Sequence, residues 1–326
     1  MDIEKLQNGS EIRRDYRTGN ICIIVPGRSH RPEEVEEEKI QDVDLSKCPF
    51  EPRNEYMTTE IMHVGDPWEI RVIENKFPEL SGNTPLTYTG GMFKSLGGYG
   101  YNEVIIDSPL HTDRFESMPS DHLLKWINTV IERQDILYQR KRIKHVFVFK
   151  NYGLRAGASL GHPHTQIMAQ PAVLGNIKKE ILISKKSMAS DDSCIYEKAA
   201  KNEMGRTLID TDYFTVIAPF GSRITAESMV MPKRHVNYTP DLTTEEKREM
   251  IEILKKVIST NRKIYGSHPY NLVFHDSKYE RSMHMHIEIY PRLSVFGGIE
   301  LGEQIFVNVI SPEEYTEAFR KASVSR

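Results

Sequence analysis

The feature that most constrains the fold is a His-x-His pair that occurs twice along the chain. Each pair follows the same series: a strand-like segment that ends near another histidine, a long amphipathic segment typical of a helix, and an apolar strand-like segment. The interval from His111 to His164 is 53 residues, and the interval from His235 to His286 is 51. Matching order and spacing predict a duplicated unit, with helices packed on mainly antiparallel sheet in each copy and thus an α+β fold.

The local patterns place the expected elements. Apolar periodicity favours helices at 120–142, 174–204 and 243–266, and strands at 20–27, 69–80, 145–151, 162–171, 213–220, 227–234, 270–276 and 284–292. Ser120 or Asp121 can cap the first helix, and Thr243 or Thr244 the last. The Gly-rich stretch 90–109 is interpreted as turns between strands. We expect the two halves to cover 1–204 and 205–326.

Charge and cysteine content exclude several classes of protein. The 326 residues include 43 basic and 46 acidic ones, without the dominant basic stripe of a nucleic-acid or membrane-surface protein. The three cysteines are far apart and odd in number, so we expect no disulfide framework and a reducing compartment. The sequence lacks a signal-like apolar segment and any apolar run of about 20 residues, so we expect a cytoplasmic protein that does not span a membrane.

The spacing of the histidines indicates their chemistry. Side chains alternate between the two faces of a strand, so we expect His162, His164 and Gln166 to share one face. His284 and His286 should share a face with each other for the same reason. An imidazole can ligate a metal, or it can attack an electrophile and move protons near neutral pH. Both uses remain open from the spacing alone.

The segment "GASLGHPHTQ" resembles the active-site motif of the galactose-1-phosphate uridylyltransferase family, a branch of the histidine-triad superfamily. The likeness extends over nearly the whole chain, through "RRDYRTGNICIIVPGRSHRPEE", "CPF" followed by "NE", "IENKFPEL", "HMHIEIYPR" and "GIELGEQIFVNVISPEEYTEAFR". It implies nucleotidyl transfer by a ping-pong mechanism with His164 as the nucleophile that becomes covalently nucleotidylated. The resemblance also places Gln166 and Ser159 among the catalytic residues. Hydrolases of the superfamily carry a third histidine at the glutamine position, so Gln166 favours transfer over hydrolysis.

The resemblance also implies the substrate contacts. It assigns the diphosphate to Arg28 and Arg31, the ribose and base to Asn75 and Phe77, the phosphoryl oxygens to Asn151 and Gly157, and the sugar to Glu300 and Gln304. The family's sugar-binding lysine and tyrosine fall on Ser294 and Ile299, which puts galactose recognition in doubt.

Several functions stay open at this point. The first is uridylyl transfer from UDP-glucose to a hexose 1-phosphate such as galactose 1-phosphate. The second is adenylyl transfer to phosphate from ADP-glucose, a dinucleoside polyphosphate or adenylyl sulfate. The third is a non-catalytic, metal-braced nucleotide-binding protein. In the transferase cases the partners are a nucleoside diphosphate sugar or other nucleotide and a sugar phosphate or phosphate, without nucleic acid.

Two metal sites are implied by the resemblance. The first predicted site, for zinc, consists of Cys48, Glu51, His111 and His162. The second predicted site, for zinc or iron, consists of Glu180, His275, His284 and His286. Glu51 stands where the family has a second cysteine, and a carboxylate is an acceptable zinc ligand. The resemblance further implies a homodimer.

Overall fold

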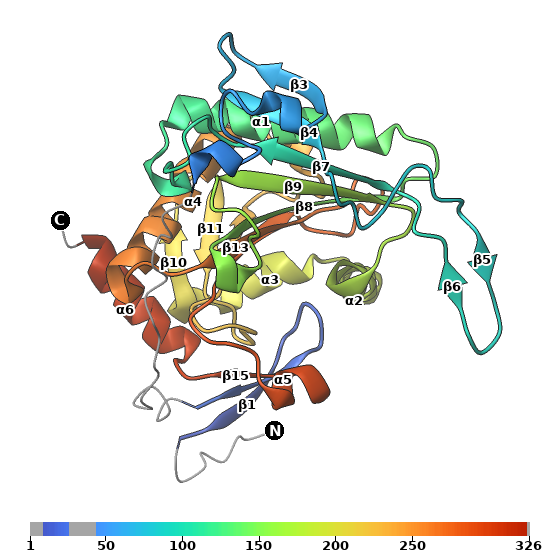
Figure 1. The fold of residues 1–326 in the computed structure, drawn as a ribbon. Coiled ribbons are helices and arrows are strands. Elements are labelled where there is room, and N and C mark those ends of the chain that lie inside the picture. Colours follow the sequence, from blue (N-terminus) through green and yellow to red (C-terminus); the bar gives the residue numbers. More distant parts are fainter. Residues whose placement is uncertain (1–8, 26–43, 325–326) are drawn as a thin grey trace.

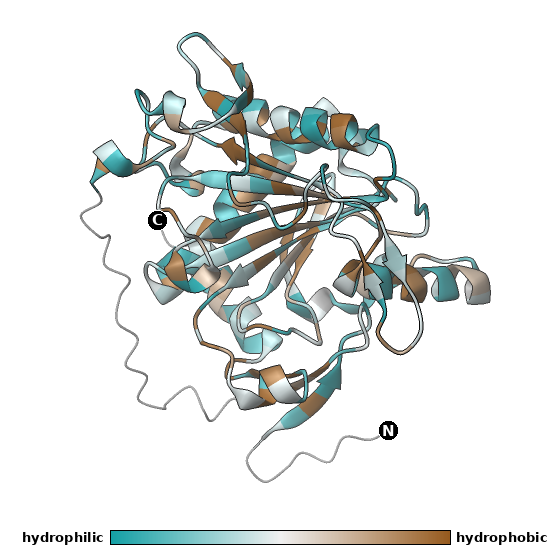
Figure 2. Ribbon diagram, turned by 45° about the vertical axis from the view of Figure 1, so that its right-hand side comes forward, coloured by the Kyte–Doolittle hydropathy of each residue, from teal (hydrophilic) through white to brown (hydrophobic). Residues whose placement is uncertain are grey.

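The computed structural model describes residues 9–25 and 44–324, and its centre is a sheet of ten antiparallel strands (Figure 1). Helices α1 (Ser120–Tyr138) and α4 (Thr244–Tyr265) pack on one face of this sheet. The start of α2 (Gly175–Asp191) lies over part of the opposite face, which we call the open face. Figure 2 shows hydrophobic residues concentrated along the strands, whereas the helices alternate hydrophobic and hydrophilic residues. The α+β fold predicted from the sequence is therefore confirmed.

The strand order shows the duplication directly. From one edge to the middle, the sheet contains β3 (Glu60–Val64), β4 (Ile70–Glu74), β7 (Tyr101–Ile106), β9 (His164–Gln170) and β8 (His145–Tyr152). From the other edge to the middle, it contains β10 (Thr207–Asp210), β11 (Phe214–Ile217), β12 (Ser228–Pro232), β14 (His286–Pro291) and β13 (Tyr270–His275). The chain follows the same path in each set, and the copies join where β13 pairs with β8, with Asn271 opposite Asn151. The boundary at residue 204 remains a prediction.

Two helix predictions need correction. The segment 174–204 forms two helices, α2 and α3 (Ile195–Asn202), because the chain turns at Asp192, which has a positive φ of 50°. Pro119, not Ser120 or Asp121, occupies the N-cap of α1, without a side-chain hydrogen bond. Thr243 caps α4 as predicted: its hydroxyl accepts from the Glu246 amide while the Glu246 carboxylate accepts from the Thr243 amide.

The His-x-His segments form shorter strands than predicted. β9 begins at His164 and β14 begins at His286, so His162 and His284 precede their strands. In the first segment, Pro163 has no N–H to contribute to a ladder. The first histidine of each pair is therefore free to point in another direction. The stretch 90–109, interpreted as turns, also contains the buried strand β7.

The remaining elements lie outside the large sheet. A small sheet joins β1 (Glu11–Arg14), β2 (Ile21–Ile24) and β15 (Ile305–Asn308), with β15 parallel to β2. A separate hairpin consists of β5 (Tyr88–Thr89) and β6 (Ser95–Leu96), and two further helices are α5 (Gly298–Gly302) and α6 (Pro312–Val324). Short 3₁₀ helices occur at η2 (Leu45–Lys47), η3 (Glu55–Met57), η4 (Phe115–Ser117), η5 (Leu154–Ala156), η6 (Met204–Arg206) and η7 (Thr239–Asp241).

The main core lies between the large sheet and the two long helices. Trp126 and Leu254 on the helices, and Val148 and Ile287 on the strands, are fully buried there. Within the described ranges, no helix is long and apolar enough to cross a membrane.

Candidate active site and metal centres

His164, the first residue of β9, lies on the open face of the sheet. The next residue, Thr165, faces α1, where its hydroxyl accepts from the Trp126 indole at 3.0 Å, so His164 and Gln166 point to the opposite side. Nδ1 of His164 lies 2.8 Å from the carbonyl oxygen of His162. A carbonyl only accepts, so Nδ1 carries the proton and Nε2 keeps a lone pair.

The environment favours the neutral form of this imidazole. Burial lowers the pKa of His164 below its ordinary value of 6.5, and the cation of Lys150 acts in the same direction. The ring also contacts Phe50 edge-on, with centroids 5.4 Å apart. A neutral, hydrogen-bonded imidazole with a free Nε2 can act as a nucleophile.

A buried ion pair supports the backbone behind His164. Lys150 on β8 donates to Asp107 Oδ2 at 2.6 Å and to the carbonyl oxygen of His164 at 3.1 Å. Both side chains are almost completely buried. Thr165 donates to the same carboxylate oxygen at 3.2 Å. These bonds join β8, β9 and the end of β7 at His164.

The predicted phosphoryl contacts lie on β8, which pairs with β9, and in the loop that follows β8. Asn151 belongs to β8, and its side-chain oxygen accepts from Asn271 of the second copy at 2.7 Å. Gly157 has a φ of +88°, and a Cβ there would lie 3.6 Å from the Asn151 amide nitrogen. Ser159 lies in the same loop and is exposed. The loop can thus approach a phosphoryl group with little steric hindrance.

The nucleoside-binding prediction falls on an exposed segment after β4. The Asn75 side chain accepts from the Phe77 amide at 3.0 Å, and the Phe77 ring is 82% exposed. Phe77 is therefore no core residue, and its ring is available to a ligand. Arg28 and Arg31 lie outside the described residues.

The predicted sugar contacts belong to the C-terminal segment of the chain. Glu300 lies on α5, where its carboxylate accepts from the Gly297 amide at 2.8 Å. Gln304 follows that helix with a positive φ of 56°. Figure 1 shows α5 beside β15 and apart from β9.

The structure brings together the four residues of the first predicted metal site. One ligand atom from each of Cys48, Glu51, His111 and His162 lies within 4.8 Å of the others. His162 Nε2 donates to the Ser108 carbonyl at 2.8 Å, which turns Nδ1 toward Glu51, 3.2 Å away. Metal-bound histidines are usually oriented by such a bond. Thiolate, carboxylate and two imidazoles form a donor set that suits zinc.

A second group of the same composition was missed by the sequence reasoning. Cys194, Glu197, His235 and His284 also place one ligand atom each within 4.8 Å. His284 Nε2 donates to the Pro232 carbonyl at 2.8 Å, as His162 does in the first group. The rings of His235 and His284 are 5.0 Å apart at 80°, against 5.1 Å and 86° for His111 and His162. The two groups are therefore equivalent positions of the duplicated unit.

The electrostatics of this second group favour an ionised thiol. Burial opposes ionisation, but hydrogen bonds with His235 and His284 lower the pKa of Cys194 to about 6. The sequence did hold a signal for this group: Cys-x-x-Glu occurs at 48–51 and again at 194–197. The third residue of each motif is aromatic, and Tyr196 contacts His286 as Phe50 contacts His164.

The second predicted metal site is wrong in one ligand. His284 points toward Cys194, because it precedes β14 and its Nε2 is held by Pro232. The residues that cluster are Glu180, His275, His286 and Glu288. His275 bridges the carboxylates of Glu180 and Glu288, at 2.9 Å from each.

Cations already compensate these carboxylates. Arg17 and Arg223 both form ion pairs with Glu288. Burial lowers the pKa of His275, but Glu180 and Glu288 outweigh it and raise that pKa to about 10. With both ring nitrogens of His275 engaged, this group fits a closed ionic network better than a metal site.

The fold and these residues define a duplicated histidine-triad unit of the nucleotidyltransferase type. The sequence profile described as "Galactose-1-phosphate uridyl transferase, N-terminal domain" matches residues 1–173, and one described as "Domain of unknown function (DUF4921)" matches residues 114–323. The chain therefore belongs to the galactose-1-phosphate uridylyltransferase family, and the protein is a nucleotidyltransferase-type enzyme.

Similar proteins differ in their named activities. An ADP-glucose phosphorylase of Arabidopsis thaliana is 28% identical over 99% of this chain and 96% of its own length. A galactose-1-phosphate uridylyltransferase of Thermotoga maritima is 27% identical over 81% of this chain and 87% of its own length. The crystal structure of an Arabidopsis thaliana ADP-glucose phosphorylase with bound ADP-glucose gives a TM-score of 0.83 at 25% identity, over 97% of this chain and 99% of that one.

Proposed function

We propose that this enzyme transfers a nucleotidyl group from a nucleoside diphosphate sugar in two steps, through a covalent intermediate on His164. The observation that carries the proposal is the state of this imidazole. Its Nδ1 proton is held by the His162 carbonyl, burial keeps the ring neutral, and Nε2 is left as the nucleophilic atom on the open face. Gln166 lies on the same face and offers an amide donor for a phosphoryl oxygen.

The two half-reactions balance at one phosphorus atom. Nε2 of His164 attacks the α-phosphorus and forms a P–N bond, while the bond to the bridging oxygen breaks and the sugar 1-phosphate leaves with its electron pair. An oxygen of the acceptor, a phosphate or a hexose 1-phosphate, then attacks the same phosphorus. The P–N bond breaks and its electrons return to Nε2. The Nδ1 proton stays hydrogen-bonded to the His162 carbonyl throughout. Water is not a reactant, because the acceptor oxygen breaks the P–N bond.

Two donor and acceptor pairs fit this chemistry. The first is ADP-glucose with phosphate, and the second is UDP-glucose with a hexose 1-phosphate. We favour the first, because the likeness to the ADP-glucose phosphorylase extends over 99% of this chain. Ser294 and Ile299 at the positions of the sugar-binding lysine and tyrosine favour the same choice.

We further propose zinc at both Cys-x-x-Glu groups and no metal at the Glu180 group. Cys48 with His162, and Cys194 with His284, would supply ligands on equivalent loops of the two copies. A closed structural zinc would hold these loops in place. In the first group it would fix His162, whose carbonyl sets the tautomer of His164. The carboxylates of the Glu180 group are already paired with cations.

We also propose that the enzyme acts as a homodimer. Within one chain, α5, which carries Glu300, lies apart from β9. A second copy that meets the open face could bring Glu300 and Gln304 to the sugar. A cytoplasmic location stays an expectation from the sequence.

Covalent labelling tests the mechanism. Purified enzyme is incubated with ADP-glucose or UDP-glucose, and the intact mass is measured before and after mild acid, which cleaves P–N bonds. We expect one acid-labile adenylyl or uridylyl group per chain in the wild type and none in His164→Asn. The matched control is His286→Asn, the equivalent position in the second copy, which should keep the label. Failure of both donors to label the folded wild type would favour the non-catalytic nucleotide-binding alternative.

A further inference from the structure

A hairpin projects from the body of the molecule. It comprises residues 85–97, with β5 and β6 as its strands, and we call it the arm. The two strands form a sheet of their own. Figure 1 shows the arm extending away from the large sheet on the side of α2, which is the side of the open face. Because an isolated hairpin is at best marginally stable in water, the arm needs a surface to pack on.

The arm presents exposed apolar side chains. Tyr88 and Leu96 are opposite each other in register, so they lie on the same face of the hairpin, and both are exposed. At the tip, Met92 is 91% exposed and Phe93 is 82% exposed. A contiguous apolar patch of this kind on the surface of a protein marks a site of contact with another protein.

The charge of the arm indicates what that partner surface carries. Lys94, at the tip, is the one charged residue between positions 85 and 97 of the sequence, and its side chain is exposed. A complementary surface is therefore apolar, with an acidic side chain and no cation.

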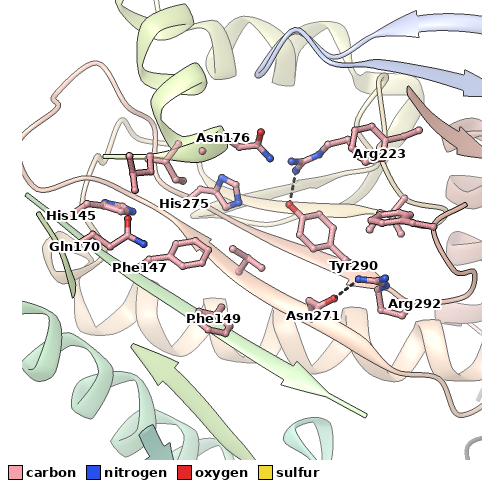
Figure 3. Close-up of a pocket in the computed structure, with 17 residues that line it drawn as sticks. His145, Phe147, Phe149, Gln170, Asn176, Arg223, Asn271, His275, Tyr290 and Arg292 are labelled. Carbon is pink, nitrogen blue, oxygen red and sulfur yellow. Dashed lines mark hydrogen bonds between the residues drawn. The ribbon is translucent and has the colours of Figure 1, made fainter. Parts of the chain in front are cut away.

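The C-terminal segment 293–304 of the same chain, which we call the α5 segment, has an anchored inner side. The Phe296 ring packs against Phe306, with centroids 5.8 Å apart, and the guanidinium of Arg292 lies over it at 4.9 Å. Arg292 in turn donates to Asn271 at 3.4 Å on the open face (Figure 3). These contacts hold the inner side of the segment on its own chain and leave the outer side accessible.

The outer side of the α5 segment complements the arm. Val295 and Leu301 are exposed, at 72% and 74%. The charged residues of the segment are Glu300 and Glu303, both acidic. The Glu300 carboxylate is occupied by the Gly297 amide, whereas Glu303 is exposed. The segment thus offers an apolar surface with an accessible carboxylate and no cation, which is what the arm requires.

We propose that the arm of one chain packs against the α5 segment of a second copy. Phe93 then covers the apolar side chains of that segment, and Lys94 meets Glu303. Within one chain the arm and α5 lie apart (Figure 1), whereas a twofold axis forms the contact twice. Tyr88 and Phe93 together expose roughly 300 Å² per arm, at 150–250 Å² for a whole aromatic side chain. Two arms that each cover an equal area of the partner bury about 1,200 Å², which reaches the range of stable interfaces.

The contact would bring the two copies together at the proposed active site. Backbone bonds from Ser81 to Gly98 at 3.0 Å and from Gly100 to Ser81 at 3.3 Å fix the root of the arm, a few residues after the segment assigned to the nucleoside. An arm held there places α5 of the second copy beside the open face of the first. The inference rests on the homodimer proposed above and names the surfaces that form it.

Sedimentation velocity of the full-length protein and its variants tests the contact. The wild type should be a dimer. Lys94→Glu and Glu303→Lys should each raise the dimer Kd by about tenfold, because two attractive pairs become repulsive. An equimolar mixture of the two variants should form heterodimers as tight as the wild type, since each of their two contacts then joins opposite charges. This rescue requires that the arm and the α5 segment belong to different chains.

Substitution of the tip tests the apolar part of the contact. Phe93→Ser should raise the dimer Kd by about a hundredfold, because the lost side chain is present twice in the dimer. The matched control is Tyr56→Ser on η3, where the ring is also 82% exposed; it should leave the dimer Kd unchanged. In Phe93→Ser the affinity for the nucleoside diphosphate sugar should fall, while that for the nucleoside monophosphate stays the same. Melting temperatures verify that each variant is folded.

Three results would overturn the inference. A wild-type dimer that neither Phe93→Ser nor the charge variants weaken would refute the arm contact and leave the homodimer standing. A mixture of the charge variants that stays as weak as each variant alone would refute the pairing of Lys94 with Glu303 across the dimer. A monomeric wild type would refute the homodimer and the arm contact together, and would assign the arm to a different protein. Covalent labelling of His164 is measured separately, and its failure in a wild-type dimer would refute the transfer mechanism alone.

Discussion

Removing the positive charge behind the nucleophile should strongly destabilise the protein. In Lys150→Met the carboxylate of Asp107 stays fully buried but loses its cation, 2.6 Å away. Breaking a buried pair on one side costs about 3–5 kcal/mol, because a charge is left uncompensated. The double variant Lys150→Met with Asp107→Asn buries no charge, and the oxygen of the introduced amide would still accept from Thr165. We expect it to lose only about 1–2 kcal/mol, the net value of the missing hydrogen bonds.

Urea unfolding followed by the fluorescence of the buried Trp126 measures these free energies. The same variants are then labelled with the donor nucleotide, because Lys150 also holds the His164 carbonyl at 3.1 Å. We expect the rate of covalent labelling to fall more than the affinity for nucleotide. A loss below about 1 kcal/mol in Lys150→Met, or equal losses in the single and double variants, would show that the pair is not what orders this part of the sheet.

Three further predictions concern metals, pH and capping. Elemental analysis should find two zinc ions per chain. Cys48→Ser and Cys194→Ser should each lose one ion, and Glu180→Gln should lose none. Loss of an ion in Glu180→Gln alone would show that the second predicted site binds metal. Because His145 has a pKa of about 4 when folded and 6.5 as its ordinary value, the unfolded chain binds more protons between these values. Stability should therefore fall as pH drops from 6.5 to 4, by up to about 3 kcal/mol, and this part of the slope should be absent from urea titrations of His145→Leu. Thr243→Ala should lose about 1 kcal/mol in the same assay, whereas Thr243→Ser should lose less because it keeps the capping oxygen.

Much of the fold could be predicted because its signals are local and repeated. The duplicated spacing of histidines, the periodicity of α1 and α4 and the Thr243 cap each depend on a few neighbouring residues. The direction of His284 could not be predicted from alternation, because the strand begins only at His286. The repeat implied a strand before His111, but the bounds of β7 were not predicted, because glycines in the same stretch suggested turns; β7 pairs with β4 and β9.

The residues of the candidate site that follow a recognised motif could be predicted. Those that only tertiary contacts bring together were missed. Cys48 and His162 are far apart in sequence, yet the resemblance was sufficient to group them. The second Cys-x-x-Glu group required recognising that the repeat includes the cysteine motif as well as the histidines. The burial of His145 depends on tertiary contacts, for which no local pattern exists in the sequence.

The small sheet has a consequence for synthesis of the protein on the ribosome. β2 is translated long before its parallel neighbour β15, which emerges only when residues 305–308 have left the exit tunnel. Until then the β1–β2 hairpin lacks a third strand, and an isolated hairpin is marginally stable in water. The β1–β2 hairpin therefore stays without its third strand until residues 305–308 are available, even if the first copy of the large sheet forms earlier.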